Sequence, residues 1–490
     1  MVIEVGDERA TFLRRLERVE RRLSEHAQQP VPSRLTDPDP GGEERWEAGQ
    51  VWAHLAEFPA YWLEQVRHVV GGAHAGDGRG GAEAEHEPVP FGRTKTDPGR
   101  LAAIERERHT DPAELLRRVS VELRNVRSTM ERLPADAWQR AGRHPTLGEM
   151  SVAQIVGRFI VAHLEEHADQ LDGLELVTLE EIRDAAERIR GAAVRTPLLR
   201  WDDRTWLKPE SLQPVGAFKM RGAYNAIASL TDEERARGVV TYSSGNHAQA
   251  VARAARLLGA KATIVMPEAA PRIKVEGVQR DGAEIVFTGP GSAERHRIAL
   301  ELVERHGYVM VEPYDDRRII AGQGTAGLEI AEDLPVTSVL IPVSGGGLSA
   351  GIAAAVKALA PDARIIGVEP ELAADARESL AAGEVVHWDA SLTTRTEADG
   401  LRVEHLGRLP FIHLRRHMDE IVTVSEDEMR AAIRRLASGA RLVVEPSGAA
   451  AMAAHLSGAA PQPHGDENRV VVISGGNIDP ARLAEILAGA

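Results

Sequence analysis

The sequence predicts a multidomain protein, with an all-α four-helix bundle over residues 1–173 and an α/β domain over residues 178–490. Three observations predict this division. At 490 residues the chain is too long for one ordinary hydrophobic core. In the first segment apolar residues recur at three- and four-residue spacings, which is typical of amphipathic helices. In the second segment apolar runs alternate with helical patterns, which is typical of a parallel sheet covered on both faces.

Composition narrows the classes of function. The formal net charge of −15 argues against non-specific binding to nucleic acid or to an anionic membrane. There are no cysteines, which excludes disulfides, thiolate nucleophiles and Cys-ligated metals. No apolar run approaches the ~18 residues of a membrane span, and the N-terminus is acidic and mixed, unlike a signal peptide. We therefore expect a cytoplasmic protein with no nucleic-acid or membrane partner.

Four helical patterns make up the first segment, and no strand pattern is convincing there. They cover about residues 9–27, 47–70, a stretch starting at Asp111, and 151–171. The last two begin with N-cap residues, because Asp111 precedes Pro112 and Glu114, and Ser151 precedes Gln154.

Three further signals concern the connections of this bundle. Pro59 should kink the second helix, because it removes one helical hydrogen bond. The Gly-rich, charged stretch 71–100 is typical of a long mobile loop. At the other end, Gly173 should end the fourth helix as a left-handed C-cap.

Three histidines of the bundle form a candidate metal site. His163 and His167 are four residues apart on the fourth helix, so their side chains project from one face. His54 lies on the second helix. Three imidazoles and a water suit Zn²⁺ or Ni²⁺ with an open coordination position. The alternative is that these histidines only line a polar boundary of the bundle.

The sequences around these histidines, residues 46–55 and 163–171, resemble the DinB-like metal-binding bundles. In that family one histidine of the second helix and an H-x-x-x-H pair of the fourth bind a divalent metal. The resemblance therefore implies a transition-metal site at His54, His163 and His167.

The second segment begins with a helix capped by Thr178 and Glu181. Strands are then predicted at residues 239–242, 262–266, 284–287, 338–342, 365–368 and 469–473. We expect them in one parallel sheet, and ligands bind such sheets at the loops that follow the carboxyl ends of strands.

Three of those loops carry unusual residues: Ser243 to His247, Ser344 to Leu348, and Ser474 to Asn477. The first precedes a helix, whose N-terminal amides can receive a carboxylate. In the second, three adjacent glycines let backbone amides converge on a phosphate. Any one of these loops could be only a tight turn, but all three together favour a ligand site.

Lys219 stands in the stretch Ser211 to Ala223, behind an aromatic residue and after a Pro/Gly-containing bend. A lysine that is held and desolvated loses proton affinity and can bond to an aldehyde. It could equally be an ordinary surface lysine. A phosphate cradle together with such a lysine suggests pyridoxal 5′-phosphate as cofactor.

Residues 178–490 resemble the fold type II pyridoxal-phosphate enzymes, which have two α/β subdomains like the tryptophan synthase β chain, and in particular their threonine/serine dehydratase and serine racemase branch. Related sulfhydrylases and tryptophan synthases usually have threonine where His247 stands. Besides the Lys219 stretch and the three loops, the matching motifs are Arg195 to Leu198, Gly322 to Thr325, Ala398 to Gly400 and Glu445 to Gly448.

The resemblance implies a role for each matching residue. Lys219 would bond covalently to the cofactor and then take the substrate's Cα proton. Asn246 would bond the cofactor's 3′ oxygen, and Ser474 would meet its pyridine nitrogen, which favours elimination or racemisation. Ser244 matches an acid/base residue of racemases that dehydratases share. The phosphate would be held by Ser344, Gly345, Gly346, Gly347 and Leu348, and the substrate by Ser243, Ser244, Gly245, Asn246 and His247.

Glu369, Ala373 and Asp375 match a Mg²⁺ or Ca²⁺ site of this branch, although they could form only an exposed acidic turn.

Two residues depart from the common pattern and bear on substrate preference. Ala217 replaces the usual serine before Phe-Lys, and Ser344 stands where many relatives have a fourth glycine.

The expected function is deamination of L-threonine or L-serine by α,β-elimination of water, giving 2-oxobutanoate or pyruvate and ammonia. The alternatives within this class are an amino-acid racemase and a dehydratase of another β-hydroxy amino acid. An alternative of another class places the activity in the bundle, as a metal-dependent thiol transferase or isomerase, or makes the bundle only a binding module. Relatives are commonly homodimers, so we expect a homodimer.

Overall fold

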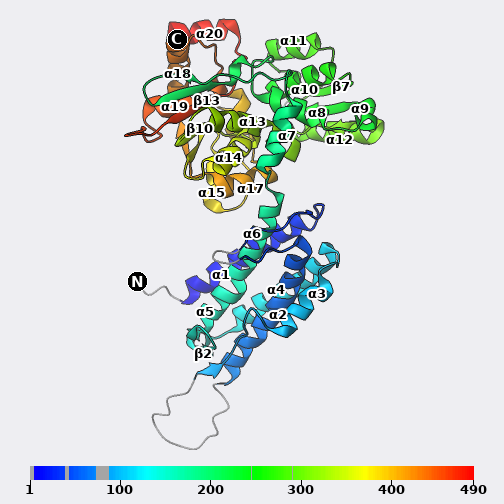
Figure 1. The fold of residues 1–490 in the computed structure, drawn as a ribbon, viewed down its shortest axis with the longest axis vertical. Coiled ribbons are helices and arrows are strands. Elements are labelled where there is room, and N and C mark those ends of the chain that lie inside the picture. Colours follow the sequence, from blue (N-terminus) through cyan, green and yellow to red (C-terminus); the bar gives the residue numbers. More distant parts are fainter. Residues whose placement is uncertain (1–4, 39–42, 73–87, 244, 290, 490) are drawn as a thin grey trace, which may run out of the picture. The chain divides into compact units, whose positions relative to one another are not determined.

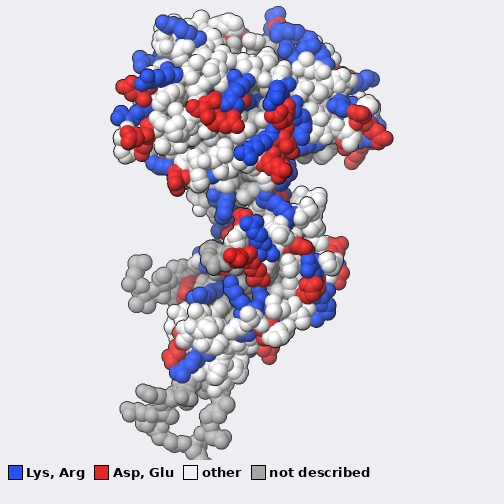
Figure 2. Space-filling model, in the orientation of Figure 1, with Lys and Arg blue, Asp and Glu red and all other residues white. Residues whose placement is uncertain are grey.

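The computed structural model describes residues 5–38, 43–72, 88–243, 245–289 and 291–489. The chain divides into two compact units, Met1–Glu175 and Leu176–Ala490 (Figure 1). On the face shown in Figure 2, basic and acidic side chains are interspersed over each unit. Within the described ranges, no helix has the length and apolar character needed to cross a membrane.

Unit 1 is a helical bundle around one apolar core, as predicted. Leu16, Leu55, Leu123 and Ile160 come from four different elements and are fully buried in that core. The helical elements are α1 (Val5–His26), α2 (Ala48–Gly72), α3 (Pro98–Glu107), α4 (Pro112–Arg132), η1 (Ala135–Gln139), α5 (Val152–Val156), the π-helical turn η2 (Gly157–Ala162) and α6 (His163–Glu175).

Three expectations for this unit were wrong. The stretch 71–100 holds a strand and the start of α3, which Asp97 caps through a bond from the Arg100 amide; residues 73–87 of it lie outside the described residues. A small sheet is present, because β1 (Val89–Pro90) pairs with β2 (Ala141–His144), which pairs with β3 (Gly148–Ser151). Gly173 lies inside α6, which runs on to Glu175 instead of ending in a left-handed cap.

The predicted caps of the bundle are present. Ser151 and Gln154 form a reciprocal capping box at the start of α5, and the Asp111 side chain accepts a bond from the Ala113 amide at the start of α4. The second helix continues through Pro59 as one element.

Unit 2 holds two sheets, in agreement with the two α/β subdomains that the family resemblance implied, whereas the alternation of strands and helices alone had suggested one sheet. The larger has the order β12-β11-β10-β13-β5-β4, and all its strand pairs are parallel except β4 with β5. The smaller has the order β8-β7-β6-β9 and is parallel throughout. The strands are β4 (Leu199–Arg200), β5 (Thr205–Pro209), β6 (Val239–Tyr242), β7 (Ala262–Pro267), β8 (Glu284–Thr288), β9 (Val309–Met310), β10 (Ser338–Pro342), β11 (Arg364–Pro370), β12 (Glu420–Val424) and β13 (Arg469–Ile473).

Helices surround both sheets (Figure 1). Where α8 and α13 pack, a Cβ on Gly322 would lie 2.6 Å from the Gly222 Cα, so only glycine allows this approach. The helical elements of this unit are α7 (Leu179–Arg188), η3 (Glu210–Leu212), α8 (Lys219–Ala228), α9 (Asp232–Arg237), α10 (Asn246–Leu257), α11 (Arg272–Arg280), α12 (Ser292–His306), α13 (Arg317–Asp333), α14 (Gly347–Leu359), α15 (Asp375–Ala382), α16 (Ala390–Thr393), η4 (Asp399–Leu401), α17 (Arg408–His417), α18 (Glu426–Gly439), α19 (Pro446–Ser457) and α20 (Pro480–Ala488).

This topology gathers the predicted loops at two strand edges. β5, β13 and β10 are parallel neighbours in the larger sheet, so the segments that follow their carboxyl ends lie at one edge. Those segments contain Lys219, the glycine run and the Ser474 loop. The Ser243–His247 loop instead follows β6 of the smaller sheet. The candidate site therefore draws on both sheets.

Candidate active site

Lys219 is the first residue of α8, and the loop before it is fixed to the loop after β13. The Phe218 amide donates to the Ser474 carbonyl at 3.0 Å, and the Gly476 amide donates to the Gly216 carbonyl at 2.8 Å. Gly216 has φ +71°, a left-handed conformation that a residue with a side chain adopts only under strain. These hydrogen bonds and the conformation of Gly216 therefore fix the backbone that positions the Lys219 side chain.

The amine of Lys219 lies in a low-dielectric environment. Its Nζ donates to the Pro313 carbonyl at 2.6 Å and lies 5.1 Å from the centroid of the Phe218 ring. Burial lowers the pKa of Lys219 to about 8. Among the residues that the structure describes, no carboxylate forms an ion pair with this amine. Lys219 is therefore poised to lose its proton near neutral pH, as a nucleophilic lysine must.

Tyr314 joins the lysine to the glycine run. It follows Pro313 directly, and a Cβ on Gly345 would lie 2.3 Å from its ring, while one on Gly347 would lie 3.1 Å from its backbone. Gly346 is the N-cap of α14 with φ +92°. The glycines thus let the run pack directly against Tyr314, at the N-terminus of a 13-residue helix, where backbone amides favour a phosphate.

The flanking residues of the run are placed differently. Leu348 is buried in the apolar core between α14 and the larger sheet. Ser344 is half-buried at the mouth of the run.

Two asparagines connect the two sheet edges. The Asn477 Nδ2 donates to the Asn246 Oδ1 at 2.9 Å and to the Val215 carbonyl at 2.8 Å. The Asn246 Nδ2 donates to the Glu445 Oε1 at 2.6 Å. Ser474 is buried, and its hydroxyl has only a 3.5 Å contact, with the Ser447 carbonyl. The structure thus brings Asn246 and Ser474 to the segment that carries Lys219.

The Ser243–His247 loop opens α10. The Gly245 amide donates to the Ser243 hydroxyl at 3.3 Å, whereas Ser244 lies outside the described residues. His247 is buried and bonds the Val311 carbonyl through Nε2 at 3.1 Å. Burial and then the charge of Lys219 lower the pKa of His247 to about 3. His247 is therefore a neutral imidazole beside the lysine.

Two groups of buried charges at this site were missed by sequence reasoning. In the first, Arg221 is fully buried and bonds both Glu210 and Glu329 at 2.7 to 2.8 Å. Lys208, also fully buried, donates to the same Glu329 at 2.5 Å. This cluster anchors the first turn of α8, two residues after Lys219. Glu329 lies 108 residues from Arg221 and 121 residues from Lys208 in the sequence, so no local pattern could have indicated the cluster.

The second group lies behind Asn246. The Lys274 Nζ donates to Asp399 at 2.5 Å and lies 3.4 Å from Glu445. Burial opposes the charge of Lys274, but Glu445 and Asp399 outweigh it and raise the pKa of this lysine. The group fixes the carboxylate that Asn246 bonds.

Glu369 lies in β11 and Asp375 begins α15. Both are buried, so the alternative prediction of an exposed acidic turn was wrong. The Glu369 carboxylate accepts bonds from the Ala376 and Arg377 amides. Both carboxylate oxygens of Asp375 are buried without a hydrogen-bond partner among the described residues. Burial raises the pKa of Asp375 to about 7. Ala373 is buried between the two on the connecting turn.

The three bundle histidines converge. The Nε2 atom of His163 lies 3.1 Å from that of His54 and 3.2 Å from that of His167. Their outer nitrogens face Glu57 at 3.5 Å, Glu166 at 3.3 Å and Gln170 at 2.8 Å. Burial and the charge of His163 hold the pKa values of His54 and His167 well below the usual range. The centre thus offers three imidazole nitrogens to one cation, with outer partners of the kind that orient metal ligands.

Comparisons with known proteins agree with both units. The family model of pyridoxal-phosphate-dependent enzymes matches residues 189–476, and the model of the DinB superfamily matches residues 15–171. L-threo-3-hydroxyaspartate ammonia-lyase of Saccharomyces cerevisiae is 38% identical over 320 residues, which cover 64% of this chain and 97% of that protein. L-threonine dehydratase of Escherichia coli K12 is 41% identical over 318 residues, covering 63% of this chain and 96% of that protein.

Among solved structures, maize serine racemase superposes with a TM-score of 0.59 at 35% identity, covering 64% of this chain and 97% of that one. The pyridoxal-phosphate family match lies within unit 2. The N-terminal segment is a domain of the DinB superfamily, and the chain belongs to the family of pyridoxal-phosphate-dependent enzymes.

Proposed function

We propose that unit 2 deaminates L-threonine or L-serine by α,β-elimination of water, releasing ammonia and leaving 2-oxobutanoate or pyruvate. The observation that carries this proposal is the amine of Lys219, held against a backbone carbonyl with its pKa lowered to about 8. Identities of 38% to an ammonia-lyase and 41% to a threonine dehydratase support the reaction class.

The residues around Lys219 fit pyridoxal 5′-phosphate. The run Ser344 to Leu348 would hold the phosphate, because it opens α14 and its backbone amides stand at the N-terminus of that helix. Asn246 would bond the 3′ oxygen with the second hydrogen of its amide, and the buried hydroxyl of Ser474 would meet the pyridine nitrogen. When bound, this cofactor supplies an electron sink for the bond that breaks at the substrate Cα.

The chain's own residues would bind the substrate and move its proton. The amides of Gly245, Asn246 and His247 begin α10 and, with the Ser243 hydroxyl, would receive the substrate carboxylate. Lys219 would then accept the Cα proton, for which a pKa near the working pH is suited. The β-hydroxyl would leave with a proton as water. Ser244 stays a proposed acid/base residue on the opposite face.

An amino-acid panel tests this function. The purified, cofactor-loaded chain is given L-threonine, L-serine and L-threo-3-hydroxyaspartate, and both the 2-oxo acid and the D-enantiomer are measured. We expect 2-oxo acid from threonine or serine to exceed any D-enantiomer. Accumulation of D-amino acid without 2-oxo acid would instead establish a racemase.

A dehydratase of an acidic β-hydroxy amino acid is the second candidate, favoured by Arg295. This half-buried arginine on α12 lies near Tyr242, the residue before the Ser243 loop. Burial lowers the pKa of Arg295, and the nearby Glu404 and Tyr242 oppose that shift. A cation at that position could pair with a β-carboxylate. Arg295→Met should then reduce turnover of 3-hydroxyaspartate and spare threonine.

We also propose a Mg²⁺ or Ca²⁺ site at Glu369, the Ala373 carbonyl and Asp375. The two unpartnered, buried oxygens of Asp375 support it, because a buried carboxylate is costly without a cation or donor. Millimolar Mg²⁺ or Ca²⁺ should raise the unfolding midpoint of unit 2, and Asp375→Asn should remove the effect. An equal rise in that variant would place the ion elsewhere.

For the bundle we propose that His54, His163 and His167 bind Zn²⁺ or Ni²⁺. The convergence of three Nε2 atoms supports this, since neutral imidazole nitrogens so close together lack enough protons to bond one another fully. The bound metal could act in thiol transfer or isomerisation, or the bundle could serve only to bind a partner. The kind of ligand that binds the metal distinguishes these roles.

A further inference from the structure

Arg100 occupies an unfavourable place in the bundle. It lies in the first turn of α3, where the partial positive charge of a helix N-terminus disfavours a cation. Its Nη1 donates to the Lys95 carbonyl at 2.8 Å. Across the described ranges, no carboxylate lies within ion-pair distance of its guanidinium. Burial, followed by the charge of Arg93, lowers the pKa of Arg100, although the charges of Glu44, Glu57 and Asp97 oppose this shift. A half-buried cation at a helix N-terminus that has no carboxylate at ion-pair distance among the described residues breaks a local rule, and such a residue points to a function.

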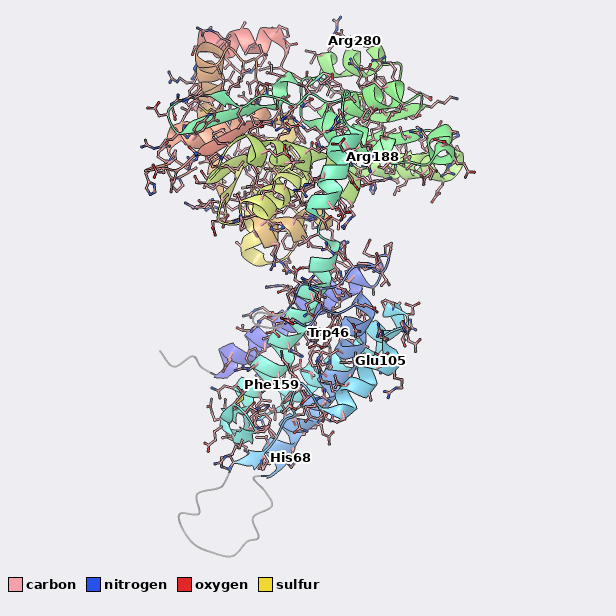
Figure 3. All side chains as sticks on the ribbon, in the orientation of Figure 1. Trp46, His68, Glu105, Phe159, Arg188 and Arg280 are labelled. Atoms are coloured by element: carbon pink, nitrogen blue, oxygen red, sulfur yellow. The ribbon has the colours of Figure 1, made fainter. Side chains whose placement is uncertain are left out.

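The side chain of Arg100 faces the histidine centre. Its guanidinium carbon lies 5.3 Å from the centroid of the Trp46 ring. Trp46, which lies among the bundle helices (Figure 3), stacks on His167 at 5.8 Å and meets the edge of His54 at 5.5 Å. The charge of Arg100 contributes to the lowered pKa of both histidines. The ring of Trp46 therefore lies beside both this cation and the candidate metal ligands.

A divalent ion bound by the histidines would add positive charge close to Arg100. The neighbouring Arg93 is compensated, because its Nη2 pairs with Glu57 at 2.6 Å. The three imidazoles are neutral when they bind a metal. The divalent ion would then add two positive charges near Arg100, on which Glu44, Glu57 and Asp97 act only from beyond ion-pair distance. Besides Trp46, the ring of Phe58 lies 4.6 Å from His163 and 5.1 Å from His54. Aromatic walls beside a positive centre suit an organic anion.

Resting on the metal site proposed above, we propose that the bundle binds a small organic carboxylate, whose carboxylate Arg100 receives while another donor atom of the ligand reaches the metal. The planar guanidinium offers paired N–H donors that match a carboxylate. An inorganic anion would gain nothing from the rings of Trp46 and Phe58.

The test uses the full chain loaded with one equivalent of Co²⁺, whose visible spectrum reports its ligands. Co²⁺ affinity is measured first, and then 2-oxobutanoate, acetate, phosphate and neutral acetamide are titrated. We expect the two carboxylates to shift the spectrum. Arg100→Met should weaken carboxylate binding at least 10-fold with Co²⁺ affinity unchanged, and Arg100→Lys should restore part of it. Arg106→Met, on the same helix but exposed and paired with Glu107, is the matched control.

The outcomes of this experiment distinguish failure of the metal-site proposal from failure of the carboxylate-site proposal. Loss of the spectrum in His54→Ala shows that the signal comes from the bundle. If wild type takes up no Co²⁺ at these histidines, the metal proposal fails and this one with it. If Co²⁺ binds but carboxylates bind equally to Arg100→Met, or phosphate and acetamide bind as well as carboxylates, the carboxylate assignment alone is overturned.

Discussion

The ring of Tyr314 lies so close to Gly345 that a methyl group added there would sit 2.3 Å from a ring carbon. Real Cβ atoms do not approach so near, so the ring or the loop would have to move. Because Pro313 beside this tyrosine accepts the bond from Lys219, a shift of Tyr314 would disturb both the glycine run and the lysine.

Gly345→Ala should therefore weaken cofactor binding by at least 10-fold, since the cradle loses its shape. Cofactor titration followed by absorbance measures this. Gly173→Ala is the control, because a Cβ there meets nothing within 4 Å and the residue lies in a helix. That change should leave cofactor affinity untouched and stabilise the bundle by about 0.5–1 kcal/mol. Unaltered affinity in Gly345→Ala would refute the cradle.

Arg221→Met should destabilise unit 2 by about 3–5 kcal/mol, because it leaves buried carboxylates of Glu210 and Glu329 without their main partner. Urea unfolding followed by the bound cofactor's absorbance reports on this unit. Glu210→Gln in the same chain should recover part of the loss, which a purely steric effect would not allow. Arg190→Met, which breaks an exposed pair with Glu187, should cost less than about 1 kcal/mol.

Cofactor capture by the apoprotein should depend on pH through Lys219. Capture needs the neutral amine, and with a pKa of about 8 the neutral fraction at pH 7 is about 300-fold larger than with 10.5. The folded-state pKa is lowered, so the rate should rise with pH and level off above about 8. Stopped-flow absorbance measures it, with a free lysine derivative for comparison. A rate still rising tenfold per pH unit at pH 9 to 10 would contradict a desolvated Lys219.

Metal should stabilise the bundle without affecting deamination. Zn²⁺ or Ni²⁺ at 100 times its Kd adds about 2.7 kcal/mol to the free energy of unfolding, and a chelator removes it. His163→Ala should abolish this gain, whereas His109→Ala, at an exposed position, should keep it. Thermal unfolding and oxo-acid production are measured on the same samples. Equal stabilisation of both variants would exclude the three-histidine centre.

The sequence predicted those parts of the fold whose signals are local. β10 and β13 match their predicted ranges, because each is an apolar run followed by a small-residue turn. β5 was missed, since it contains the buried Lys208, whose charge is compensated by Glu329, 121 residues away. α3 was missed because its Asp97–Pro98 start stands in a glycine-rich stretch that suggested a loop.

At the candidate site, too, features with a local sequence signal were predicted and features that depend on distant contacts were not. The predicted residues Lys219, Asn246 and Ser474 lie on segments that hydrogen bonds join. The roles of Pro313 and Tyr314 were not predicted, because the sequence does not indicate which backbone carbonyl accepts a hydrogen bond or which ring packs against a glycine. The division of the loops between two sheets was also missed, since strand order depends on long-range pairing that runs of apolar residues do not encode.

The most direct test of the account is to locate the covalent bond to the cofactor. The loaded protein is reduced with borohydride, digested, and mapped by mass spectrometry. The account predicts the pyridoxyl group on Lys219, and loss of both label and oxo-acid production in Lys219→Ala. A label on the buried Lys208 or Lys274, or undiminished turnover in Lys219→Ala, would contradict it.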